Sequence, residues 1–235
     1  MKKRMIVATM LTMLAATMGA CGKESQNQSG LYEQSVEDAV FAEEDEIMDL
    51  VSLTREDDRV TWDDQGRVLL LTFHSYPDSY PEGETVTLEW GEVWTFTEKE
   101  MASRFAEEMK EDKDYDLALK HLLGLPQEKE STTVTAFWVD PQDVIRPAYQ
   151  MDATDGSMTV TLSDDVDEEY KAWFDQNILD SYFYGDYPWT RLGYTYNWGG
   201  HGTEYGVTEF LVKSGAQVEV EYTKTEEDFA NGLVR

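Results

Sequence analysis

The sequence predicts an α+β fold, with a mainly antiparallel sheet of about seven to nine strands and three or four inserted helices. Most strand-like segments follow one another across short turns, which is how antiparallel strands are connected. The helical segments lie between groups of strands. They do not alternate with single strands, as a doubly wound parallel sheet would require. The chain shows no internal repeat.

The first elements follow from periodicity and turn chemistry. Residues 36–53 carry apolar side chains at roughly helical spacing among acidic ones, which predicts an amphipathic helix. Residues 59–62 and 67–73 flank an Asp-rich turn that ends at Gly66, and this arrangement predicts a hairpin. Residues 85–96 alternate with period two on both sides of a glycine, so they predict a strand pair or one bulged strand.

Two helices are predicted next. Thr97 and Glu100 have the spacing of a capping box, so a helix is expected to begin there. A second helix is expected from Tyr115 to Leu123, because Gly124 and Pro126 are typical helix-ending residues. Two further helices are expected over residues 164–184 and 225–230. The remaining strands are expected over residues 132–139, 157–162, 190–198, 205–212 and 217–222.

The start of the chain carries a targeting pattern. Three basic residues at positions 2–4 precede the apolar stretch Met5–Thr17, which is too short to span a bilayer. Met18-Gly-Ala-Cys21 follows. This arrangement resembles the signal peptide and lipobox of bacterial lipoproteins, with Met18 where that family usually has leucine. The resemblance covers residues 1–21 and implies removal of residues 1–20 and diacylation of the Cys21 thiol.

The resemblance also implies a domain organisation and a location. After the signal peptide, residues 21–45 are expected to be the lipidated cysteine and a polar, acidic tether, followed by one acidic α+β domain over residues 46–235. Two acyl chains suffice for stable anchoring, so an extracytoplasmic protein held on the bacterial membrane is expected. Cys21 is the only cysteine, which excludes a disulfide and a thiol nucleophile from the mature domain.

The charge excludes one class of partner. The chain has a formal net charge of −29 at pH 7. Such an acidic surface repels phosphate backbones and anionic headgroups, so nucleic acid is not an expected partner and the acyl chains must hold the protein on the membrane. The expected partners are the membrane, through Cys21, and a glycan, a peptide or another envelope protein.

The stretch of residues 188–206 is the main candidate for a ligand surface, because it combines aromatic rings with several glycines. Exposed rings stack on sugar faces, and neighbouring polar groups supply hydrogen bonds. The alternative is structural: the aromatic residues are core and the glycines shape a hairpin. The candidate ligand residues are Trp189, Tyr194, Tyr196, Trp198, His201 and Glu204.

Two enzymatic alternatives stay open. His74, His201 and Glu204 could supply the three protein ligands of a catalytic zinc site, which would make the protein a metal-dependent hydrolase. Residues 209–220 are similar to the strand that carries the catalytic glutamate of ADP-ribosyltransferases, which implies that role for Glu209, although Val207 stands where that family has a second acidic residue.

Common catalytic motifs are absent from the sequence: it has no G-x-S-x-G, no Walker loop and no dinucleotide-binding fingerprint. No cofactor is therefore expected. The sequence favours a non-catalytic binding or accessory module, with the metal-dependent hydrolase as the alternative.

Overall fold

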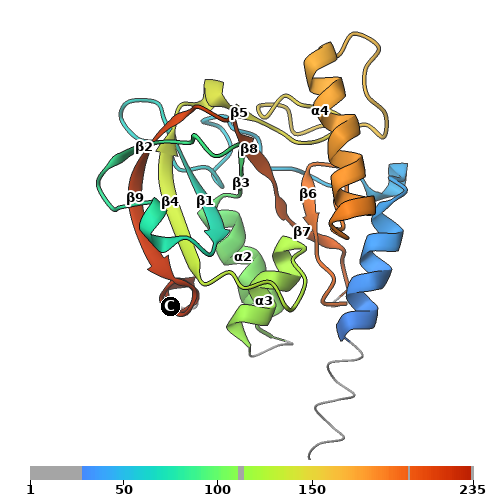
Figure 1. The fold of residues 1–235 in the computed structure, drawn as a ribbon, viewed down its shortest axis with the longest axis horizontal. Helices are drawn as coiled ribbons and strands as arrows, with labels where there is room; N and C mark the ends of the chain where they lie inside the picture. The colour runs from blue at the N-terminus through green and yellow to red at the C-terminus, as the bar shows by residue number, and fades with distance from the viewer. Residues whose placement is uncertain (1–27, 111–113, 201, 234–235) are drawn as a thin grey trace, which may run out of the picture.

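The computed structural model describes residues 28–110, 114–200 and 202–233 (Figure 1). The first helix covers residues 28–39. The other α-helices are α2 (Glu98–Glu108), α3 (Tyr115–Leu123), α4 (Glu168–Leu179) and α5 (Glu226–Leu233). A π-helical turn, η4 (Asp180–Tyr184), continues α4, and short 3₁₀ turns are η1 (Glu44–Glu46), η2 (Pro77–Ser79) and η3 (Pro141–Asp143). The strands are β1 (Val68–His74), β2 (Thr85–Thr87), β3 (Val93–Thr95), β4 (Thr133–Val139), β5 (Val144–Ile145), β6 (Tyr194–Tyr196), β7 (Tyr205–Thr208), β8 (Phe210–Val212) and β9 (Gln217–Thr225).

All strand pairs are antiparallel, which confirms the α+β prediction. One sheet has four strands in the order β1-β4-β9-β2, a second has three in the order β3-β8-β5, and β6 and β7 form a separate pair. None of the helices in the described ranges is long and apolar enough to cross a bilayer.

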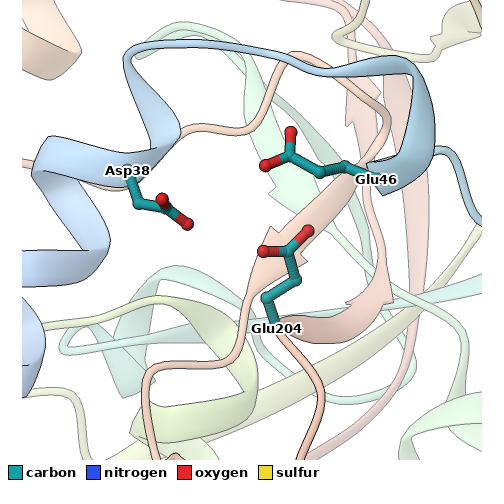
Figure 2. A group of neighbouring side chains, drawn as sticks. All are labelled: Asp38, Glu46 and Glu204. Carbon is teal, nitrogen blue, oxygen red and sulfur yellow. The ribbon is translucent and has the colours of Figure 1, made fainter.

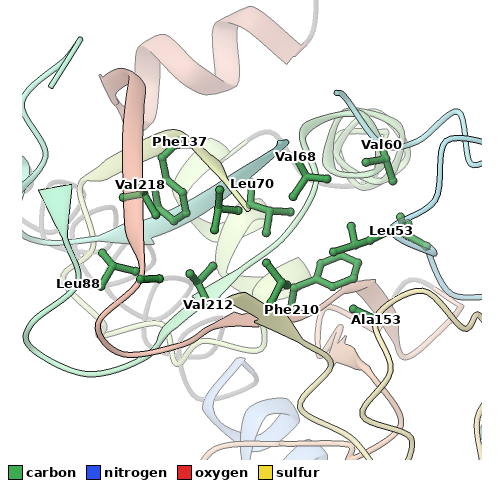
Figure 3. Close-up of a cluster of buried hydrophobic side chains, with 14 residues drawn as sticks. Leu53, Val60, Val68, Leu70, Leu88, Phe137, Ala153, Phe210, Val212 and Val218 are labelled. Carbon is green, nitrogen blue, oxygen red and sulfur yellow. The ribbon is translucent and has the colours of Figure 1, made fainter. Parts of the chain in front are cut away.

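Strands β1 and β4 of the four-stranded sheet are buried on both faces. Val68 and Leu70 of β1 point into a core shared with the three-stranded sheet, where they join Phe210 and Val212 (Figure 3). Leu69 and Leu71 of β1 point the other way, into a second core formed with α2, α3 and α5. Because alternate residues of a strand face opposite sides, the apolar run of β1 follows directly from its position between the two cores.

A bulge lets strand β9 serve both cores. Val220 pairs with Phe137, but Tyr222 pairs with Ala136, so Glu221 is the extra residue in β9. An extra residue reverses which side chains face which side of the sheet. Val218 accordingly packs in the first core, whereas Tyr222 packs against the second.

Helix α3 has the predicted bounds and the predicted ends. The Asp114 side chain accepts a hydrogen bond from the Leu117 N–H, and Gly124 ends the helix with a φ of 62°. Helix α2 begins as predicted after Thr97, but the predicted capping box is wrong. The Thr97 side chain caps no N–H group. Glu100 turns into the interior, where it accepts hydrogen bonds from Thr208 and Tyr205.

The helix predicted over residues 36–53 is wrong. The helix covers residues 28–39 instead, and it ends where Arg191 and Tyr182 donate hydrogen bonds to the Ala39 carbonyl. Beyond η1 the chain is extended, with Leu50 and Val51 buried. The part of the predicted tether from residue 28 onward is therefore packed on the domain, while residues 21–27 lie outside the described residues.

Five strand predictions need correction. Residues 59–62 form only a bridge between Trp62 and Val68, and residues 205–212 divide into β7 and β8, which belong to different sheets. Residues 85–96 form neither one strand nor a pair, because β2 pairs with β9 and β3 pairs with β8 in the other sheet. Residues 157–162 form no strand. The strand expected over residues 190–198 shortens to β6, because Arg191 and Gly193 adopt φ angles of 60° and 82°, which an extended strand does not allow.

Candidate functional site

A groove with a volume of about 1040 Å³ is lined by residues from several distant segments of the chain. One side is formed by the end of β1, by β3 and by the loop before β3. The other side is formed by the end of α3, the end of α4 with η4, and the chain leading into β6. The aromatic residues in its lining are Phe73, Tyr76, Tyr80, Trp90, Trp94, Phe96, Tyr187, Trp189 and Tyr196.

Several of these rings are open to solvent. Trp90 is 99% exposed, Tyr76 is 70% exposed and Trp94 is 38% exposed. Other ring contacts hold lining residues in place: Trp94 lies edge-on against Trp189 with ring centroids 6.3 Å apart, and Trp173, which is not a lining residue, lies edge-on against Trp189 at 6.0 Å. The groove thus combines packed and exposed aromatic rings.

Two strand edges line this groove. The backbones of Leu71 and Phe96 form a double hydrogen bond, with N–O distances of 2.9 and 3.0 Å, which joins the four-stranded sheet to the three-stranded one. Beyond that bridge, β1 and β3 are each the outer strand of their sheet. Phe73 and Trp94, each two residues beyond the bridge on its strand, both belong to the lining.

Glu209, between β7 and β8, is a buried part of the same lining. Burial raises the pKa of its carboxyl group to about 8, although the Trp189 side chain and the Arg146 guanidinium favour the ionised form. Within the described residues its Oε1 atom has no hydrogen-bond partner, and the same holds for Nδ2 of Asn177, another lining residue. Buried polar atoms are normally paired, so this is an unusual arrangement.

The predicted ligand residues separate into two groups. Trp189 and Tyr196 line the groove, although the Trp189 ring is only 5% exposed and packs in a core cluster with Tyr170 and Phe174. Tyr194 and Trp198 are 1% and 2% exposed, so their rings do not form the expected stacking surface. Trp198 is covered because Tyr32, from the N-terminal helix, packs edge-on against it at 5.5 Å. His201 lies outside the described residues.

Glu204 belongs to a different site, a group of three carboxylates with Asp38 and Glu46 (Figure 2). Their oxygens lie within 4.8 Å of one another. Tyr194 donates a hydrogen bond to Glu204 at 2.7 Å, and Tyr196 donates one to Asp38 at 2.8 Å. Burial raises the pKa of Glu46 and Glu204, and the neighbouring acids add to both shifts. Three carboxylates are a donor set that suits a hard cation such as Ca²⁺.

His74, the third residue of the predicted metal site, lies in the groove lining and not in this carboxylate group. Its Nε2 is 2.9 Å from the Thr135 hydroxyl, and its Nδ1 accepts a hydrogen bond from the Tyr76 N–H. Burial lowers the pKa of the imidazole to about 4, so it is neutral at pH 7. Both ring nitrogens are already engaged within the protein.

Most of the groove was missed by sequence reasoning. Trp90 and Trp94 are predicted only as strand residues and Tyr76 lies in no predicted element, since nothing local distinguishes an exposed ring from a core ring. Glu209 did carry a signal: it is a carboxylate between Val207 and Phe210, in an otherwise apolar strand segment.

Comparisons with protein-family models, with curated proteins and with solved structures give no match to this chain. The evidence for a function is therefore the geometry and chemistry of the groove.

Proposed function

We propose that this protein is a membrane-anchored extracytoplasmic lipoprotein that acts as a non-catalytic binding or accessory module, and that the groove binds its ligand, a glycan or a peptide. The observation that carries the binding role is the row of exposed aromatic rings along a groove of about 1040 Å³. Ligand sites are typically concave and lined by aromatic side chains with a few polar groups.

The exposure of the rings supports this role. Leaving large apolar side chains in water forgoes the stabilisation that burial would give, about 1.5–3 kcal/mol for a large side chain. Trp90 is 99% exposed and Tyr76 is 70% exposed, and both border the same groove. Clustered exposed apolar surface of this kind is typical of binding sites.

The non-catalytic part of the proposal rests on the state of the groove's histidine. His74 is neutral at pH 7 and uses both ring nitrogens in hydrogen bonds with Thr135 and Tyr76. A general base needs a free nitrogen directed at its substrate. The location rests on the lipobox resemblance at Cys21, which lies outside the described residues.

The test is a binding screen with the purified domain, using a glycan array and a library of short peptides. Trp90→Ala should weaken binding of any ligand found by about tenfold or more, because alanine removes a whole ring from the groove. Tyr184→Ala is the matched control: this ring is 78% exposed but does not line the groove. Equal binding by the two variants would contradict the proposal.

A further inference from the structure

We infer that the ligand of this groove is an extended peptide, which pairs with the strand edges at Phe73 and Trp94 and places a basic side chain against Glu209. The inference rests on the proposed binding function and narrows its ligand class from a glycan or a peptide to a peptide that carries lysine or arginine.

The strand edges supply the first step. In an antiparallel ladder, alternate residues direct their N–H and C=O groups to the same side. Leu71 and Phe96 bond to each other across the bridge, so Phe73 and Trp94 direct their backbone groups to that same side. Within the described residues, no hydrogen bond satisfies these groups there. A peptide strand satisfies such edges by β-augmentation, which a sugar cannot do.

The groove gives an extended peptide access to these edges. Phe73 and Trp94 both line the same groove of about 1040 Å³. Successive side chains of an extended peptide point in opposite directions. One set would therefore face the aromatic rings of Trp94 and Trp189, and the other would face the outer rings of Tyr76 and Trp90.

The charge of the groove selects a basic side chain. Glu209, Glu92 and Asp180 are acidic lining residues, and Lys129 is the basic one among the described lining residues. The whole chain has a net charge of −29. The rings add to this preference, because indole faces attract lysine and arginine side chains.

Glu209 is the residue that can receive this side chain. It is 5% exposed, it lines the groove, and its Oε1 has no partner within the described residues. The groups that face it are Arg146 from the chain after β5, Trp189 from the chain before β6, Tyr170 of α4 and Tyr182 of η4. The Arg146 guanidinium stabilises the ionised form of Glu209 but does not line the groove. The groove side of the carboxyl group is therefore left for a ligand.

The test compares matched peptides taken from the library screen. For each peptide that binds, a version with norleucine in place of lysine removes the charge, and a version with N-methylated backbone amides removes the strand hydrogen bonds. Both changes should weaken binding by about tenfold or more. With the Glu209→Gln variant, the preference for the lysine peptide over the norleucine peptide should shrink by at least half, because glutamine keeps the shape of the side chain but cannot lose a proton to pair with the ammonium group. Glu227→Gln, an exposed acid on α5, is the control and should keep the lysine preference.

The outcomes separate this inference from the proposed function. Binding to the glycan array with no binding to peptides would overturn the inference and leave the binding function in place. Peptides that bind equally well with norleucine, or with N-methylated backbones, would also overturn it. Loss of folding in Glu209→Gln is detected by circular dichroism, and the norleucine and N-methyl peptides still test the inference on the unchanged protein. No binding to either library would overturn the proposed function itself.

Discussion

Two buried glutamates show how hydrogen bonding separates a structural carboxyl group from a candidate functional one. Glu100 is buried, but its oxygens accept hydrogen bonds from the Thr208 N–H, the Thr208 hydroxyl and the Tyr205 hydroxyl. Glu209 lies next to Thr208 and is equally buried, yet Oε1 has no partner within the described residues. A buried polar group without a partner costs about 1–3 kcal/mol. Glu100 therefore holds β7 against α2. The Oε1 atom of Glu209, a groove-lining residue, can still accept a hydrogen bond.

The raised pKa of Glu209 predicts how stability depends on pH. Its pKa rises from the ordinary 4.5 to about 8 in the folded protein. Between these pH values the folded state holds a proton that the unfolded state has lost, so stability falls as pH rises, with a slope of about 1.4 kcal/mol per pH unit from this group. Glu209→Gln removes that slope. The free energy of unfolding of this variant, relative to wild type, should therefore increase steadily across this window in urea titrations.

The control for this measurement is Glu227→Gln, because the Glu227 side chain is exposed on α5. Its difference from wild type should stay constant across the same pH range. The other buried acids with raised pKa values, such as Glu100, contribute the same pH dependence of stability to wild type and to the variant. Their contributions therefore cancel when the two free energies of unfolding are subtracted. A Glu209→Gln difference that does not change with pH would show that the carboxyl group is ionised in the folded protein.

At the scale of elements, strand β7 and helix α3 are in very close contact. The Thr195 hydroxyl of β6 donates a hydrogen bond to the Leu122 carbonyl of α3 at 2.6 Å and accepts one from the Val207 N–H at 3.0 Å. Gly206 lies in the middle of this contact. A Cβ atom there would lie 2.6 Å from the Thr195 carbonyl oxygen and would also clash with the Leu122 carbonyl oxygen.

Gly206→Ala should therefore destabilise the protein by about 2–4 kcal/mol, because backbone atoms of two elements would have to move apart. Gly232→Ala is the matched control: it changes a glycine of α5 that has open space around it, and alanine there should stabilise the helix by up to about 1 kcal/mol. Thermal unfolding of the two variants gives the comparison. Equal melting temperatures would contradict the close packing of α3 on β7.

The predictable elements were those whose signals are local. Helix α3 had its bounds predicted because Asp114 and Gly124 fix its ends through their own backbone and side-chain chemistry. The segment of residues 36–53 has an apolar pattern that resembles a helix. Leu50 and Val51 are apolar because they are buried in an extended part of the chain, and not because they form one face of a helix. Thr97 and Glu100 had the right spacing for a capping box, but Glu100 is drawn into the interior by Thr208, which is distant in sequence.

At the scale of the whole molecule, the groove could not be predicted because distant segments form it. Its lining comes from the end of β1, the chain around β3, the end of α3, the end of α4 and Glu209. Local periodicity cannot show which of these segments meet. The aromatic stretch at residues 189–198 is predicted as a ligand surface, but Trp198 is buried against His121 of α3 and Tyr32 of the N-terminal helix. Of the four aromatic residues predicted there as ligand contacts, only Trp189 and Tyr196 line the groove.

The packed N-terminal helix also limits how far the domain can stand from a membrane. The helix is described from residue 28 onward and is fixed to the domain by hydrogen bonds from Tyr32 to the Asp186 carbonyl and from Tyr196 to Asp38. Residues 22–27 separate it from Cys21. Even a fully extended chain of that length spans only about 20 Å. An anchored protein would therefore hold its domain close to the bilayer surface.

Cys21→Ser tests the anchor at this scale. Serine lacks the thiol that receives the lipid, so the variant should leave the membrane fraction for the soluble one, while wild type stays with the membrane because two acyl chains bind it stably. Mass spectrometry of the wild-type protein should find a mature chain that begins at a diacylated Cys21. The folded domain should be unaffected, so both proteins should have the same melting temperature and the same affinity for any groove ligand. Wild-type protein that retains residues 1–20, or that is released without lipid, would contradict the proposed location and leave the groove's binding role to stand on its own measurements.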